Sequence, residues 1–134
     1  MTHRITEVLL PSLAEGAAIE GLHGNGYQGR SVANAIANSM KAAGLQPTEV
    51  DQEDWGWYFE VDIGSATVLI GASGDPGHQA SSDPYVVQVQ VNLGWLPRTR
   101  RLRMSAGDEA IKHVEIALKA AEPGLAKIDW VERG

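Results

Sequence analysis

A glycine-rich segment ahead of a predicted helix has the spacing of a phosphate-binding loop. Residues 24–31 read Gly-Asn-Gly-Tyr-Gln-Gly-Arg-Ser. Glycines allow backbone amides to wrap around a phosphate, and the beginning of a helix adds positive potential. An arginine, however, stands where such loops carry the lysine that reaches between phosphates, so a plain glycine loop is the competing interpretation. The residues that would contact a phosphate are Gly24, Gly26, Gly29, Arg30 and Ser31.

A second group of chemically capable side chains lies within one connecting segment, residues 71–84. It contains Asp75, His78, Ser81, Ser82 and Asp83. Catalytic sets usually assemble from distant segments that rigid elements hold in place, whereas these side chains share one stretch of chain. Gly, Ser, Asp and Pro are also the residues that a turn requires. We therefore predict a mobile loop over 72–84 and assign no catalytic residue, metal or cofactor.

Four arginines lie close together before a predicted helix. They are Arg98, Arg100, Arg101 and Arg103. Basic side chains beside exposed helix amides can hold an anion, including a nucleic-acid phosphate. Nucleic-acid binding is nevertheless disfavoured, because the whole chain is acidic and no aromatic residue lies among the arginines. They remain candidates for anion binding, with charge pairing inside the fold as the alternative.

An acidic and aromatic segment is the most unusual part of the chain. Residues 53–59 read Glu-Asp-Trp-Gly-Trp-Tyr-Phe. Trp57 fits the pattern of a core residue, whereas Trp55 could either anchor a protein partner or cover the end of the core near Trp95 or Trp130. The candidate binding residues are the acidic Glu49, Asp51, Glu53, Asp54, Glu60 and Asp62, with Trp55 and Tyr58 as anchors.

Composition and charge limit the classes of protein that this chain can be. Its 134 residues fit one domain, 1–134, and the absence of cysteine excludes disulfides and cysteine-bound zinc. No apolar run approaches the ~20 residues of a membrane span, and none resembles a secretory signal, so we expect a cytoplasmic protein. The net charge of −6 is uneven, because residues 42–97 contain eight acidic residues and no Lys or Arg. Such a layout favours salt-sensitive association with a basic partner.

Two helices are predicted from apolar spacing. The first covers 31–43, with Val32, Ile36 and Met40 on one face, Ser31 as its N-cap and Gly44 as the residue that ends it. The second starts at Ser105, with Asp108 completing a capping box, and ends before Pro123. A glycine-rich loop, 11–29, precedes the first helix.

Alternating apolar residues predict the strands. Segments 57–63 and 66–72 form a hairpin around Gly64, which pairs Ile63 with Ala66. A third strand covers 85–95, and weaker ones are expected at 48–53 and 128–131. Residues 4–10 fit either a short strand or a helical turn.

These elements predict an α+β fold: a two-layer sandwich with a mostly antiparallel sheet of four or five strands and two helices packed on one face. The opposite sheet face would carry Tyr58, Glu60, Asp62, Leu69, Val86, Gln88, Gln90 and Asn92. We therefore favour a small, non-catalytic protein-binding module of the inhibitor or immunity type, acting through its acidic strands. The mixed polarity of the open face also predicts a homodimer, in which a two-fold axis matches acidic residues to the arginines.

Overall fold

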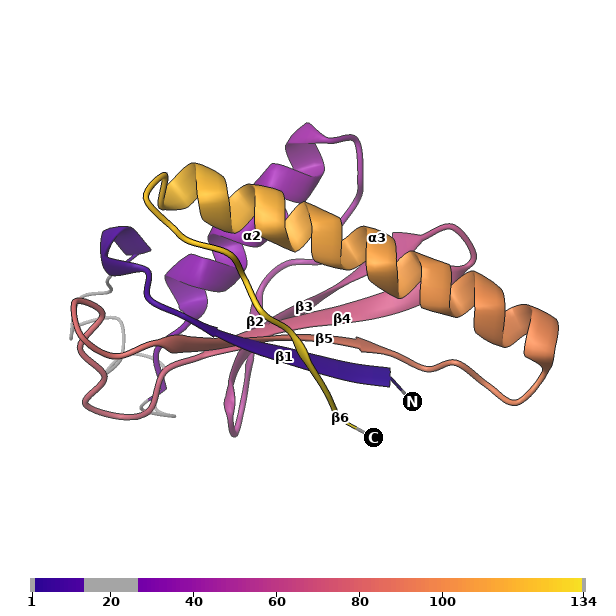
Figure 1. Ribbon diagram of the computed structural model, residues 1–134, viewed down its shortest axis with the longest axis horizontal. Helices are drawn as coiled ribbons and strands as arrows, with labels where there is room; N and C mark the ends of the chain where they lie inside the picture. The colour runs from indigo at the N-terminus through magenta and orange to yellow at the C-terminus, as the bar shows by residue number, and fades with distance from the viewer. Residues whose placement is uncertain (1, 14–26, 134) are drawn as a thin grey trace.

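In the part of the chain that the structure describes, six antiparallel strands form one sheet, and two helices cover one of its faces (Figure 1). The computed structural model describes residues 2–13 and 27–133. The strands lie side by side in the order β2-β3-β4-β5-β1-β6. Their bounds are Thr2–Val8 (β1), Asp51–Glu53 (β2), Gly56–Ile63 (β3), Ala66–Ser73 (β4), Tyr85–Val91 (β5) and Val131–Arg133 (β6). The helical elements are the 3-10 turn η1 (Pro11–Leu13), α2 (Arg30–Ala42) and α3 (Pro97–Ala121).

The predicted two-layer α+β class is confirmed, but the described sheet has six strands instead of four or five. The additional strand is β1, at the N-terminus. The sequence pattern of residues 4–10 fits either a short strand or a helical turn, and the structure shows a strand. β1 pairs with β5 on one side and with β6 on the other. Both partners are distant in sequence, so no local hairpin signal accompanies them.

The central hairpin follows the predicted register. Ile63 pairs with Ala66, and Trp57 pairs with Ala72 at the far end of the ribbon. Gly64 has φ +61°, which glycine adopts without a steric penalty. The alternating pattern therefore determines both the strands and their pairing.

Helix α2 confirms the predicted apolar face, although its cap differs from the prediction. Val32, Ile36 and Met40 are fully buried. The N-cap is Gly29, not Ser31, because the chain enters the helix at φ +126° in close contact with β4. A Cβ at Gly29 would lie 2.4 Å from the carbonyl oxygen of Ala72, so this position requires glycine.

Helix α3 corrects the prediction for the C-terminal half. It begins at Pro97, well before Ser105, so the four arginines lie inside its first turns. Proline suits the first helical position and arginine is a good helix former, which explains why the helix extends without an apolar stripe there. Strand β5 ends at Val91 and not at the predicted residue 95. Strand β6 occupies Val131–Arg133 and shares only Val131 with the predicted strand over 128–131.

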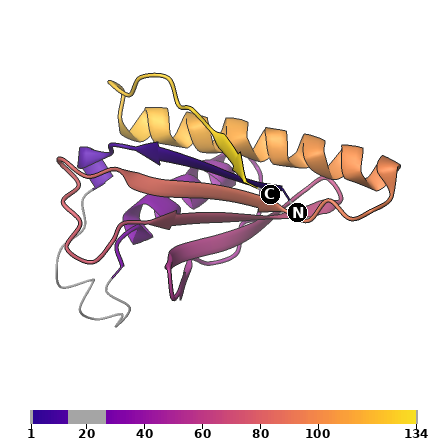
Figure 2. The same cartoon turned by 60° about the horizontal axis from the view of Figure 1, so that its bottom comes forward.

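The core lies between the helices and one sheet face. Its largest fully buried side chains include Tyr85, Phe59, Leu10, Ile36 and Met40. Among the described residues, no helix covers the other face, which Figure 2 turns towards the viewer. The described chain therefore buries one side of the sheet and leaves the other side open.

Candidate functional site

One row of paired residues crosses the open sheet face from β3 to β1. Tyr58 on β3 pairs with Gly71 on β4, Gly71 with Gln88 on β5, and Gln88 with Ile5 on β1. Directly paired residues on neighbouring strands point to the same face, so this row is shared by side chains of mixed polarity. A surface of this composition is neither a core nor a purely solvated face.

Trp55 lies on this open face, directly over Gly71. A Cβ added to Gly71 would be only 2.5 Å from the Cη2 atom of the Trp55 indole. The indole is half-buried, and its ring centroid lies 6.4 Å from that of Tyr58 at an angle of 46°. The other position considered from the sequence, at the core end near Trp95 or Trp130, is not the one adopted. Trp95 is 83% exposed, and the Trp130 indole donates to Glu115 on α3.

Carboxylates surround this aromatic pair on the β2–β3 ribbon. Asp51 stands opposite Tyr58 in the pairing of β2 with β3. The pKa of the Tyr58 hydroxyl is raised above its usual value, mainly by burial and further by the negative charges of Asp51, Glu53 and Glu60. These carboxylates are therefore close enough to act together on one side chain.

The six predicted acidic residues lie on or next to strands β2 and β3. All six are exposed. A hydrogen bond from the Thr48 amide to the Glu60 carbonyl holds the segment before β2 along β3. Asp62, near the far end of β3, accepts a hydrogen bond from the Thr67 hydroxyl at 2.7 Å. We call this surface the acidic edge, and it consists of Glu49, Asp51, Glu53, Asp54, Trp55, Tyr58, Glu60 and Asp62.

A polar network in the middle of the open face was not foreseen from the sequence. Nε2 of His3 lies 2.6 Å from Oε1 of Gln88, and the Gln90 amide donates to the same oxygen at 2.8 Å. The alternation of Gln88 and Gln90 signalled a polar face, but nothing local connected His3 to them. The network fixes three polar side chains beside the acidic edge.

The described part of the glycine-rich segment serves the packing of α2. The Arg30 guanidinium lies 5.5 Å from the centre of the Trp57 ring, and the Ser31 hydroxyl donates to the Leu13 carbonyl. Gly24 and Gly26 lie outside the described residues. Phosphate binding here stays a prediction, which a thermal shift with ATP, GTP or a dinucleotide would test.

The four arginines divide into two pairs. Arg100 donates to the Gly94 carbonyl at 2.6 Å and Arg103 to the Asn92 carbonyl at 2.9 Å, so both fix the connection from β5 to α3. Arg98 and Arg101 are exposed, and within residues 2–13 and 27–133 neither side chain forms a hydrogen bond or an ion pair. The predicted strand over 85–95 included Trp95. The exposed Trp95 indole close to Arg98 in the chain was therefore not foreseen.

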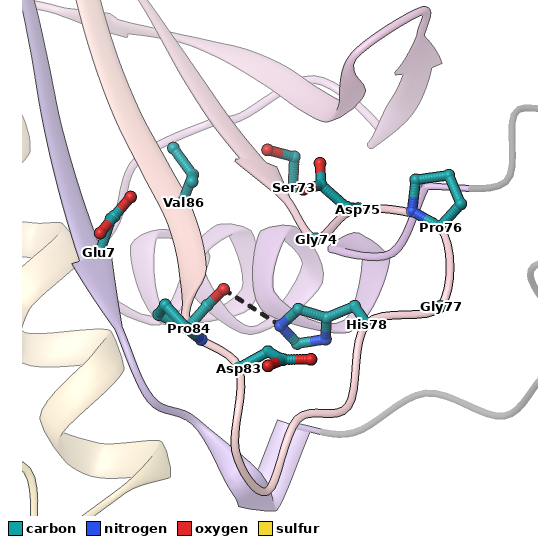
Figure 3. A pocket seen from close by; sticks show the side chains of 10 residues that line it. All are labelled: Glu7, Ser73, Gly74, Asp75, Pro76, Gly77, His78, Asp83, Pro84 and Val86. Atoms are coloured by element: carbon teal, nitrogen blue, oxygen red, sulfur yellow. Dashed lines mark hydrogen bonds between the residues drawn. The ribbon is translucent and has the colours of Figure 1, made fainter.

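A pocket of about 370 Å³ lies beside the predicted loop over 72–84 (Figure 3). The His78 imidazole is buried there, 3.1 Å from the Pro84 carbonyl through Nε2, and its ring lies 4.3 Å from the Tyr85 ring. Because a carbonyl only accepts, Nε2 carries the proton, and Nδ1 is left buried with no partner in the described chain. Gln28 anchors the same loop by donating to the His78 carbonyl.

The polar side chains of this loop act within the loop. Asp83 accepts a hydrogen bond from the Gln79 amide at 2.9 Å, and the His78 amide donates to the Asp75 carbonyl at 2.8 Å. Figure 3 marks the bond between the His78 imidazole and the Pro84 carbonyl. Within residues 2–13 and 27–133, no three metal-binding side chains gather around a common point. The loop therefore offers a shaped pocket without an assembled reactive group.

No protein-family pattern matches the sequence, and a search of curated proteins gives no significant match. Among the helices that the structure describes, none has the length and apolar character needed to cross a membrane. The acidic edge and its surroundings are the candidate functional surface.

Proposed function

We propose that this protein is a non-catalytic binding module whose acidic edge docks on a basic surface of another protein, as inhibitor and immunity proteins do. The observation that carries the proposal is the position of Trp55, which lies over Gly71 on the open sheet face instead of in the core. Aromatic residues with low conformational freedom are the usual anchors of protein interfaces.

The charges around the anchor match the composition of a protein interface. A half-buried aromatic pair, Trp55 and Tyr58, is bordered by exposed carboxylates. Apolar contact at such a centre supplies most of the affinity, whereas the surrounding charges select an oppositely charged partner and speed its approach. Binding should therefore weaken as salt rises.

The edge strand β2 favours side-chain recognition over strand addition. It has three residues, all exposed, and two of them are acidic. Short, charged edge strands resist pairing with a strand from another chain. A partner is accordingly expected to lie across the side chains of the acidic edge and not to extend the sheet.

The placement of the other chemically capable residues supports a non-catalytic role. Arg30 packs over Trp57, and the buried His78 supports the turn that leads into β5. We also propose a cytoplasmic location, which suits a chain without cysteine. We propose self-association as a homodimer separately, because the open face mixes apolar and amide side chains.

Comparative capture from an extract of the native host tests this proposal. The bait is the wild-type chain, the edge-reversed variant D51K/D54K/E60K, or the control D75K/E109K/D129K, whose three sites are exposed acids elsewhere. Both variants change the net charge equally, from −6 to 0. We expect proteins that bind the wild type and the control to be lost from the edge-reversed variant. Equal capture by all three baits would reject the acidic edge as the docking surface.

A further inference from the structure

An exposed apolar and basic surface lies at the N-terminal end of α3. This end of the helix and the connection leading to it project beyond the strands (Figures 1 and 2). Trp95 is 83% exposed, Leu96 50% and Leu102 56%. Arg98 and Arg101 are exposed beside them. We call these five residues the basic tip.

The backbone of the basic tip is held in place, although its exposed side chains do not pack into the core. The Arg100 and Arg103 guanidiniums bind the carbonyls of Gly94 and Asn92, which fixes the connection that carries Trp95. The first turn of α3 has no acidic residue to balance its dipole, so the tip concentrates positive charge. A rigid support under an exposed indole indicates a contact surface.

We infer that the basic tip docks on the acidic edge of a second copy of this chain. The inference rests on the proposed function, since it names an occupant for the same acidic edge. Within one chain, Arg98 and Arg101 have no partner among the described residues, and neither Asp54 nor Glu60 forms an ion pair there. Matching surfaces that do not meet in one copy can meet between two.

Local surface chemistry favours a second copy over a polyanion as the occupant. The net charge of −6 opposes the long-range approach of another copy as well as that of an anionic lipid surface or a nucleic acid, so the local surfaces decide. A second copy instead offers a compact acidic surface that has its own aromatic side chains, Trp55 and Tyr58. Apolar contact with Trp95 can then accompany the pairing of charges.

A two-fold axis would use each contact twice, because every copy has one basic tip and one acidic edge. Two separate contacts made together strengthen each other and close the assembly at a dimer. The dimer would also cover the surface that a basic partner needs. Binding of such a partner is therefore expected to compete with self-association.

Charge-swapped variants in sedimentation equilibrium test this inference. The tip-reversed variant is R98E/R101E, and the edge-reversed variant is D51K/D54K/E60K. Each alone places like charges in contact, so we expect its dimer dissociation constant to rise at least about tenfold over that of the wild type. An equimolar mixture restores opposite charges at both contacts and should form the dimer again. The control K112E/K119E changes two exposed lysines of α3 away from the tip and should behave as the wild type.

Three outcomes would overturn the inference. They are a wild-type mass of 14.4 kDa up to about 100 μM, a dimer that survives R98E/R101E, and a mixture of the two variants that stays monomeric. Tip-dependent binding to phosphatidylserine vesicles by a monomeric wild type would instead assign the tip to a membrane. A monomer whose acidic edge still captures partners would reject the dimer and leave the proposed function standing.

Discussion

Substituting Gly71 by alanine is the sharpest local test of where Trp55 lies. The new Cβ would stand 2.5 Å from Cη2 and 2.8 Å from Cζ3 of the indole. Carbon atoms in contact are normally about 3.5–4.0 Å apart, so the ring must move by roughly 1 Å or leave the sheet face. The backbone at Gly71 itself is ordinary, because its φ is outside the positive range. The substitution therefore acts on the indole and not on the turn geometry of the strand.

Two opposing effects determine the change in stability. Lifting the indole exposes on the order of 100 Å² of apolar surface, which at about 25 cal/mol/Å² costs about 2.5 kcal/mol. Replacing glycine by alanine restricts the unfolded chain and returns about 0.4–1 kcal/mol. We therefore expect Gly71→Ala to lower the free energy of unfolding by about 1.5–2 kcal/mol. In a Trp55→Ala background the new Cβ meets only the Gln88 Cγ atom, at 3.0 Å, so the same substitution should cost much less.

Urea unfolding of the four chains in this double-mutant cycle measures both values. Gly124→Ala is the matched control, because a Cβ there meets nothing within 4 Å. It should leave the protein as stable or slightly more stable. If Gly71→Ala has the same effect with and without Trp55, the indole does not lie over this glycine. The structural basis of the proposed anchor would then be wrong.

Three further predictions concern separate parts of the fold. Gly29→Ala should be among the most destabilising single changes. Alanine at the Gly29 φ of +126° costs about 1–3 kcal/mol of folding free energy, and the new Cβ also meets the β4 backbone. Thermal unfolding measures this loss of stability. Ultraviolet titration should show Tyr58 ionising above its usual pKa of 10, and Asp51→Asn should reduce this rise without abolishing it, because burial is the main cause. The pKa of Glu122 is lowered by the Ser12 amide, so its stabilising contribution is full above pH 4.5 and is lost as the pH falls below that value. Glu122→Gln should accordingly reduce the free energy of unfolding more at pH 6 than at pH 3.

Local patterns accounted for the parts of the fold that neighbouring residues build together. The β3–β4 hairpin could be predicted with its register, because alternating apolar residues flank Gly64 and a register slip would turn them outward. Helix α2 could be predicted because its buried residues repeat at helical spacing. In both cases the signal and the contact lie within one short stretch of sequence.

Contacts between distant segments were beyond sequence reasoning. β1 lies between β5 and β6, which come from the middle and the end of the chain. The first turns of α3 bury no residue before Ala106, so no apolar stripe marked them. At the site, the acidic residues were found by composition, whereas the position of Trp55 depends on the missing side chain of Gly71 on another strand. Such a fit between two segments becomes visible only in three dimensions.

Hydrogen–deuterium exchange of the protein with and without a captured partner tests the central claim most directly. The peptide spanning residues 49–62 contains β2, most of β3 and the Trp55 anchor. We predict that binding slows exchange in this peptide and leaves α2 and the C-terminal half of α3 unchanged. Protection confined to the helices, or to the loop that carries His78, would contradict the assignment of the acidic edge as the docking surface.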